Sequence, residues 1–182
     1  MITPQQLFSE TMSLYFEEGS RFTMDEVAAR LGISKKTLYE VVSSKNDLAV
    51  NMVEYYFAQV AALQEEIHAD PALRPVEKLK KLLCATPDLP MRKYHLQELK
   101  RGFPAAYAVL DEHLRQGWER TLAILDQAKA QGAVRNIDNA LFSKVYAAAI
   151  EDILMENDIH TNLTFRQKQE QIVDILLFGI CN

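Results

Sequence analysis

The chain has 182 residues, of which 48% are of hydrophobic type and 25% are charged. These proportions are ordinary for a globular protein and exclude fibrous and intrinsically disordered classes; the length suffices for one large domain or two smaller ones. A net charge of −5 and an isoelectric point near 5.4 argue against a basic coat over the whole surface but leave room for a local basic patch.

Neither a targeting segment nor a membrane span is expected. The start, 1–6, shows no basic segment followed by an apolar stretch, and no apolar run approaches the ~20 residues of a membrane helix. We therefore expect a cytoplasmic protein. Cys84 and Cys181 lie outside any C-x-x-C motif or histidine cluster, so we expect two reduced, partly buried thiols, without a disulfide or a zinc site.

Apolar residues recur with the 3.6-residue period of helices, and no stretch alternates with the two-residue period of strands. The six glycines and six prolines fall at the joints between these segments. The sequence therefore predicts an all-α fold of about nine helices. Their expected ranges are 5–18, 23–32, 35–42, 45–67, 76–85, 91–101, 104–131, 139–156 and 164–178, with Gly117 as a candidate bend. The fourth would be roughly 35 Å long, enough to join two domains.

The two short helices expected over 23–32 and 35–42 meet the requirements of a helix-turn-helix. The sequence LGIS joins them, with Gly32 in the turn, and small Ala28 lies where the helices must approach each other. The apolar contacts of the motif would come from Ile33, Leu38 and Val42. In such a motif the second helix enters the DNA major groove by its N-terminal end.

The N-terminal end of that second helix carries two lysines. Ser34 is a good N-cap, which places Lys35 and Lys36 in the first turn, where the helix dipole favours acidic side chains. A DNA phosphate or a base-edge acceptor would supply the missing negative partner. The lysines thus favour a DNA-contacting role over a solvated turn in some other helical protein.

Residues 3–57, and above all FTMDEVAARLGISKKTLYEVVSSKNDLA, resemble the N-terminal domain of the tetracycline-repressor (TetR) family of bacterial transcriptional regulators. The matching pattern is T-x-x-x-[IVL]-A-x-x-x-G-[IV]-S, then L-Y, then S-K-x-x-L. Beyond this part, the match is supported by the lengths of the expected helices and by the glycine and proline residues between them. The resemblance implies a helix-turn-helix DNA-binding domain over 1–47 and a helical effector-binding and dimerisation domain over 48–182.

The resemblance also implies a set of DNA-binding residues: Thr23, Ser34, Lys35, Lys36, Thr37, Tyr39 and Lys45. Thr23 and Lys45 would hold backbone phosphates through an amide or ammonium group, Tyr39 would reach a phosphate with its hydroxyl, and the others would face the groove. Glu40 and Val41 depart from the aromatic or basic residue and the histidine usual at these positions. The first 50 residues hold five basic and seven acidic side chains, so non-specific DNA affinity should be modest.

For the second domain the resemblance implies a pocket for a small organic effector. Its candidate lining residues are Tyr55, Met91, Tyr94, His95, Phe103, Tyr107 and Trp118. Aromatic and methionine side chains suit an apolar or amphipathic ligand, but each is also a common core residue.

The last two helices are apolar on more than one face, which indicates either a second partner or a central position in the chain's own core. We expect a homodimer through Phe142, Tyr146, Ile150, Ile153, Ile172 and Leu176. Such a dimer would bind a palindromic operator, and the effector would release it from DNA. The sequence names neither operator, effector nor target genes.

Two alternatives stay open: an all-helical metal-carboxylate enzyme, and a helical interaction protein that binds no DNA. Asp152, Glu156 and His160 follow each other at intervals of four residues and would share one helix face if the helix ran that far. The sequence contains neither H-E-x-x-H nor G-x-S-x-G, and its four histidines are scattered. We therefore expect no enzyme, no metal and no cofactor.

Overall fold

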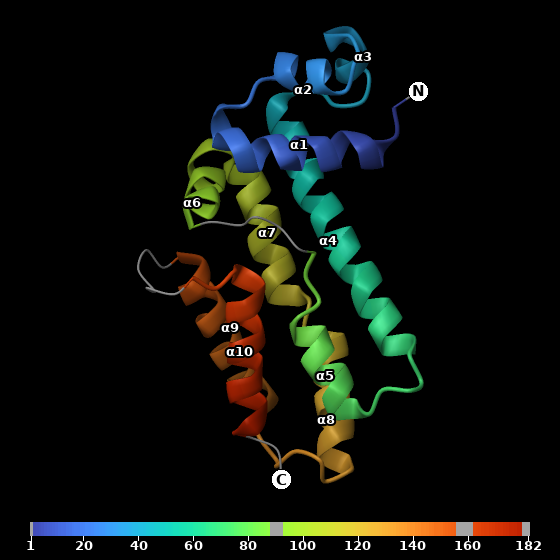
Figure 1. Cartoon of the computed structure of the whole chain (residues 1–182), viewed down its shortest axis with the longest axis vertical. Helices are drawn as coiled ribbons and strands as arrows, with labels where there is room; N and C mark the ends of the chain where they lie inside the picture. Colours follow the sequence, from blue (N-terminus) through green and yellow to red (C-terminus); the bar gives the residue numbers. More distant parts are fainter. Residues whose placement is uncertain (1, 88–92, 156–161, 180–182) are drawn as a thin grey trace. The chain divides into compact units, whose positions relative to one another are not determined.

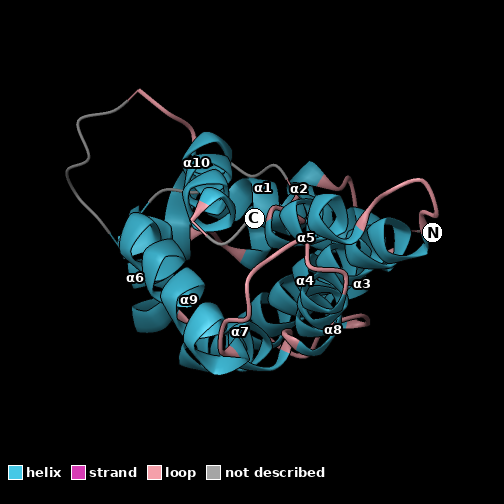
Figure 2. Ribbon diagram, turned by 90° about the horizontal axis from the view of Figure 1, so that it is seen from below, coloured by secondary structure: helices cyan, strands magenta, loops and turns pink. Residues whose placement is uncertain are grey.

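The structure is a computed structural model that describes residues 2–87, 93–155 and 162–179. Throughout these ranges it consists of helices and loops (Figure 2), which confirms the all-α prediction. The helices labelled in Figure 1 are α1 (Pro4–Glu18), α2 (Met24–Arg30), α3 (Lys35–Tyr39), α4 (Lys45–Ala69), α5 (Pro75–Leu83), α6 (Lys93–Gly102), α7 (Pro104–Gln116), α8 (Glu119–Ala130), α9 (Asn139–Met155) and α10 (Phe165–Phe178). A 3₁₀ turn, η1 (Gly19–Arg21), follows α1. Among these helices, none in the described part of the chain combines the length and apolar character needed to cross a bilayer.

The prediction of a single helix over 104–131 is wrong. Gln116 ends α7 and Glu119 begins α8, with Gly117 and Trp118 in the break between them. Glycine in a helix interior lowers helix stability by about 1 kcal/mol relative to alanine. At Gly117 the helix is therefore interrupted and not merely bent. The break lets the Trp118 ring lie 5.4 Å from the ring of Tyr146 in α9.

Packing divides the chain into two compact units, Met1–Ala58 with Pro90–Leu114, and Gln59–Leu89 with Arg115–Asn182. The boundary falls within α4 and α7. The boundary predicted between residues 47 and 48 divides the chain by function, not by packing, and it stays a prediction.

In the first unit, α6 is seated on the end of α1 and on η1. The Tyr15 hydroxyl donates to the backbone oxygen of His95, and the buried His95 ring places Nε2 3.1 Å from the Phe16 oxygen. Burial raises the pKa of Tyr15, which keeps the hydroxyl a donor. The Glu98 carboxylate accepts the Ser20 N–H at 2.9 Å.

This seating depends on the absence of a side chain at Gly19. Its φ of +63° favours glycine, and a Cβ there would stand 1.7 Å from Glu98 Oε2. The backbone of η1 and the Glu98 carboxylate therefore come together only because position 19 is glycine.

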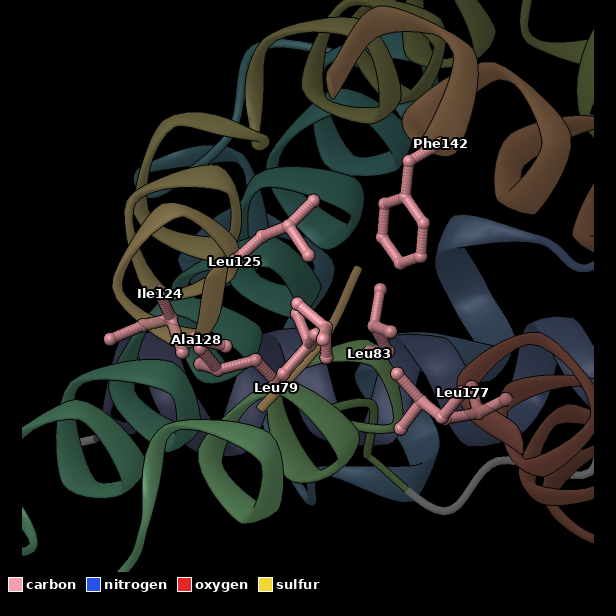
Figure 3. Close-up of a cluster of buried hydrophobic side chains, with 10 residues drawn as sticks. Leu79, Leu83, Ile124, Leu125, Ala128, Phe142 and Leu177 are labelled. Carbon is pink, nitrogen blue, oxygen red and sulfur yellow. The ribbon is translucent and has the colours of Figure 1, made fainter. Parts of the chain in front are cut away.

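The core of the second unit joins α5, α8, α9 and α10 (Figure 3). Its buried residues are Leu79, Leu82, Leu83, Ile124, Leu125, Ala128, Val134, Phe142, Val173 and Leu177. Each helix contributes apolar side chains to this core, and burying them against each other removes their surface from water. Hydrophobic burial thus holds α9 and α10 against α5 and α8.

A buried polar network crosses this core. Gln169 of α10 is buried, and its Nε2 donates to the Leu83 oxygen and to the Tyr146 hydroxyl, both at 3.0 Å. The Tyr146 hydroxyl in turn donates to the same Leu83 oxygen, and Thr86 Oγ1 donates to Gln169 Oε1 at 3.1 Å. The network satisfies the carbonyl at the end of α5, which the helix leaves without an intrahelical partner.

Cys84 carries a free, half-buried thiol, and burial raises its pKa to about 11. Such a thiol stays protonated and inert at neutral pH. Cys181, the other thiol expected to be reduced, lies outside the described residues.

We predict that Gln169→Ala lowers the free energy of unfolding by about 2–3 kcal/mol, because the hydroxyls of Thr86 and Tyr146 lose their hydrogen bonds to the amide and a cavity opens. Gln171 lies on the same helix but is exposed, so Gln171→Ala is the matched control and should change stability by less than about 0.5 kcal/mol. Urea unfolding followed by circular dichroism at one protein concentration measures both. Equal stability of the two variants would contradict the importance of the network.

Candidate nucleic-acid interface

The turn between α2 and α3 is closed by two backbone hydrogen bonds. The Gly32 N–H donates to the Ala29 oxygen at 3.1 Å, and the Ile33 N–H donates to the Ala28 oxygen at 3.0 Å. This is the Schellman arrangement, which requires a left-handed residue after the helix, and Gly32 has φ +62°. The turn sends the chain directly into the N-cap of α3.

α2 packs against α1 and α3 (Figure 1). Val27, Ala28, Leu38 and Val42 are buried, as the helix-turn-helix reading requires, whereas Ile33 is only half-buried. α3 ends at Tyr39, three residues before the predicted end at Val42. The result is a short second helix anchored by Leu38, with its first turn at the surface.

That first turn presents four polar residues. Ser34 is the N-cap, and its Oγ accepts the Thr37 N–H at 3.0 Å and lies 2.9 Å from the Thr37 hydroxyl. Lys36 is exposed, and across the described ranges no acidic side chain lies within ion-pair distance of it. The ammonium of Lys36 is therefore available to an external anion at the positive end of α3.

Lys35 has an internal partner. Its Nζ lies 2.9 Å from Asp25 Oδ2, an exposed pair that joins the first turns of α2 and α3. The hydrogen bond to Asp25 raises the pKa of Lys35, since it favours the charged form. Exposed pairs of this kind are weak, so a stronger anion can displace Asp25.

The end of α3 is more apolar. The Tyr39 side chain is 45% exposed, and Val41 just beyond the helix is exposed to a similar degree, beside exposed Glu40. The Tyr39 hydroxyl is thus open to a phosphate, while Val41 offers only methyl groups and Glu40 repels anions.

Thr23 is engaged within the chain. Its N–H donates to Glu26 Oε2 at 2.7 Å, and its Oγ1 accepts the Glu26 N–H at 3.2 Å, which is the predicted capping box. The amide expected to hold a phosphate is therefore occupied by a carboxylate. A phosphate contact through this amide would require Glu26 to leave.

Lys45 is engaged as well. Its Nζ donates to the Ser20 oxygen at 2.7 Å and lies over the rings of Phe22 and Phe103. The ammonium is half-buried, and this burial lowers the pKa of Lys45. The sequence shows no local signal for this arrangement, because the two rings stand far from position 45 in the chain.

Arg30 is also paired inside the chain, with the carboxylates of Glu10 and Glu17 in α1. The guanidinium of Arg30 therefore points toward these acidic side chains. The spacing of the three residues in the sequence does not predict these ion pairs. The exposed cations that an anion can reach here are therefore Lys36, Lys35 after release from Asp25, and Arg21 of η1, just before α2.

The effector candidates differ in burial and are distributed over both units. His95 and Phe103 are buried within the first unit, Tyr94 is exposed, and Tyr55 and Tyr107 are half-buried, the latter below the ammonium of Lys100. Trp118 belongs to the second unit. Met91 lies outside the described residues.

The candidate dimer residues divide into two sets. Phe142 is buried in its own unit and the Tyr146 hydroxyl is bonded to Leu83, so both belong to the core of the single chain. Ile150, Ile153, Ile172 and Leu176 are half-buried. The large apolar side chains that α9 and α10 expose are instead Leu141, Val145, Ile175 and Phe178.

Of the candidate metal ligands, Asp152 is exposed near the end of α9, and Glu156 and His160 lie outside the described residues. Within the described ranges, no three His, Cys, Asp or Glu side chains come close enough together to hold a metal ion.

A glycine-closed turn, a short second helix and a cationic first turn at the surface together define a DNA-binding protein of the helix-turn-helix class. No protein-family model matches the chain. Its sequence is 33% identical over 180 residues to the uncharacterized HTH-type transcriptional regulator YvaF of Bacillus subtilis (strain 168), covering 97% of this chain and 94% of that protein.

Two solved structures are similar in fold. A TetR-family transcriptional regulator from Agrobacterium tumefaciens has a TM-score of 0.73 at 17% identity, covering 99% of this chain and 100% of its own. AibR in complex with isovaleryl coenzyme A and operator DNA has a TM-score of 0.66 at 19% identity, covering 96% and 97%. The chain belongs with its relative to the HTH-type transcriptional regulators, so it is a regulator and not an enzyme, and its fold is the one found in TetR-family regulators.

We predict that Asp25→Asn raises the affinity for a non-operator DNA duplex about two- to fivefold at low salt, because it frees Lys35 and removes a charge that repels phosphate. Fluorescence anisotropy measures the affinity. Asp25→Glu keeps the charge and should bind like the wild type. In the Asn variant the pKa of Lys35 should also fall toward its ordinary value in an NMR titration. Unchanged DNA affinity would show that Asp25 does not restrain Lys35.

Proposed function

We propose that the protein is a homodimeric repressor that binds a palindromic operator and leaves it when a small organic effector binds. The observation that carries the proposal is the exposed first turn of α3, with its unpaired Lys36 ammonium at a helix N-terminus in the described structure. Ser34, Lys35, Lys36 and Thr37 would face the major groove and Tyr39 a phosphate. Residues 1–47 would form the DNA-binding domain, acting in the cytoplasm.

The dimer is supported by the apolar surface of α9 and α10. Ile175 is 72% exposed and Phe178 is 85% exposed, and Leu141 and Val145 of α9 are exposed as well. Large apolar side chains gathered on two neighbouring helices mark interaction surfaces. Pairing with the same helices of a second copy would bury them in a four-helix bundle related by a two-fold axis.

The two-fold symmetry of such a dimer would determine the symmetry of the DNA sequence that it binds. Its two α3 helices would sit about 34–36 Å apart to enter successive major grooves, so the operator would be a palindrome with that half-site spacing. An effector that favours another spacing would weaken operator binding through a coupling of typically about 1–3 kcal/mol.

The effector would bind in residues 48–182. AibR, which has a similar fold, was solved in complex with isovaleryl coenzyme A and operator DNA. In the present chain the first unit offers Tyr55 and Tyr107 as half-buried aromatic residues suited to an amphipathic organic ligand, and the second unit offers Trp118. His95 and Phe103 are already engaged within the chain and are weaker candidates.

We predict that selection from a pool of random duplexes yields one inverted repeat whose half-site centres lie about 10 base pairs apart, or a multiple of this distance. Sequencing of the bound pool after successive rounds measures it. Lys36→Ala should bind the selected duplex severalfold more weakly, with about one fewer counterion released. A selected direct repeat, or no enrichment, would refute the proposed reading.

We predict that Ile175→Glu converts the dimer to a folded monomer, because the charge would be buried without a partner at the dimer interface. Ile175 is exposed in the single chain, so its own core should tolerate the change. Light scattering after size exclusion measures the mass. Gln171→Glu, exposed on the same helix, is the control and should stay dimeric. A dimer of unchanged stability in Ile175→Glu would place the interface elsewhere.

A further inference from the structure

The ammonium of Lys45 occupies an aromatic site inside the first unit. Nζ lies 4.6 Å from the ring centre of Phe22 and 5.2 Å from that of Phe103, and the two rings are 5.8 Å apart. Both rings are buried, and the Ser20 oxygen accepts a hydrogen bond from the same ammonium at 2.7 Å. Two ring faces and a carbonyl oxygen replace part of the stabilisation that the ammonium loses with its water.

These partners come from two segments that are far apart in the sequence. Ser20 belongs to η1, Phe22 stands between η1 and α2, and Phe103 joins α6 to α7. Lys45 itself is the first residue of α4, which follows the helix-turn-helix. One side chain therefore links the start of α4 to the segment before α2 and to the α6–α7 junction.

The α6–α7 junction is held at the same place by other contacts. The Glu98 carboxylate accepts the Ser20 N–H at 2.9 Å, so both backbone polar groups of Ser20 are bound, one by α6 and one by α4. At Gly102 a Cβ would stand 2.6 Å from the Ser20 Cβ, which shows how closely the end of α6 approaches η1. Ser20 is thus the point where α4 and α6 meet.

We propose that Lys45 is a positioning residue that clamps the helix-turn-helix to the α6–α7 junction, and that it is not a phosphate ligand. The proposal rests on the proposed reading of DNA by α3. The clamp keeps α2, α3 and α6 in one arrangement, so the fraction of the protein competent to bind operator depends on Phe103 as well as on Lys45. A shift of Phe103 would change DNA affinity without any change in the groove-facing residues.

The test compares Lys45→Met, Phe103→Leu and the double variant on the selected operator duplex at several salt concentrations. Methionine keeps a long apolar stem and loses the charge, and leucine keeps the apolar volume and loses the ring face. Each single variant should lose about three- to tenfold in affinity, and the double variant should lose no more than the larger single loss. The dependence of log K on log salt should keep its wild-type slope in all three.

Lys36→Ala is the reference for a true DNA contact and should lower the salt slope by about one. A similar loss of slope in Lys45→Met, or wild-type affinity in both single variants, would overturn the clamp. An unchanged slope in Lys36→Ala would instead refute the reading by α3. The two failures are therefore distinguishable.

A measurement on the wild-type protein decides the case if a variant does not fold. The ε-methylene protons of Lys45 should resonate upfield of those of other lysines because of the two rings, with the signal assigned by its loss in Lys45→Arg. The upfield shift should persist when the operator duplex is added. Its collapse to the ordinary lysine position on DNA binding would show that the ammonium moves to a phosphate.

Discussion

The direction of α3 depends on the closed turn at Gly32. Two backbone hydrogen bonds return to the end of α2, and they form only because position 32 has a left-handed backbone that costs glycine little. Every contact proposed with DNA, from Ser34 to Tyr39, is placed by this turn and by the burial of Leu38 behind it. The polar side chains of the first turn of α3 point in a defined direction because the turn at Gly32 has a single backbone conformation.

Most cationic side chains in the DNA-binding part have a partner within the chain, and this part carries no excess of positive charge. Arg30 is bound to two glutamates, Lys35 to Asp25, and the ammonium of Lys45 to aromatic rings and a carbonyl. Lys36 is the lysine of α3 that keeps its charge open within the described structure. Few open cations give little general attraction to phosphates, so in the proposed mode of binding, discrimination between DNA sequences would rest on a few contacts at the groove.

Periodicity and caps predicted most of the fold. The capping boxes of Thr23 and Thr164 formed as expected, and Gly32 stands in the turn, because each depends on residues within a few positions of each other. The sequence did not indicate two kinds of feature. At Gly117 the sequence predicted a bend where the structure has a break, and local pattern does not distinguish the two because glycine can either bend or end a helix. The engagement of Lys45 and the burial of Phe142 depend on residues far away in the sequence, where local pattern is silent.

The network at Gln169 has a consequence for partner choice. Its hydrogen bonds to Leu83 and Tyr146 hold α10 at one rotation about its own axis. Phe178 follows nine positions later, which at 3.6 residues per turn corresponds to about 180°, so a side chain fixed inward at one end dictates which side chain faces outward at the other. An apolar core alone would tolerate some rolling of the helix. The hydrogen bonds of Gln169 fix the rotation of α10, and in the proposed dimer this would give both copies the same outer face.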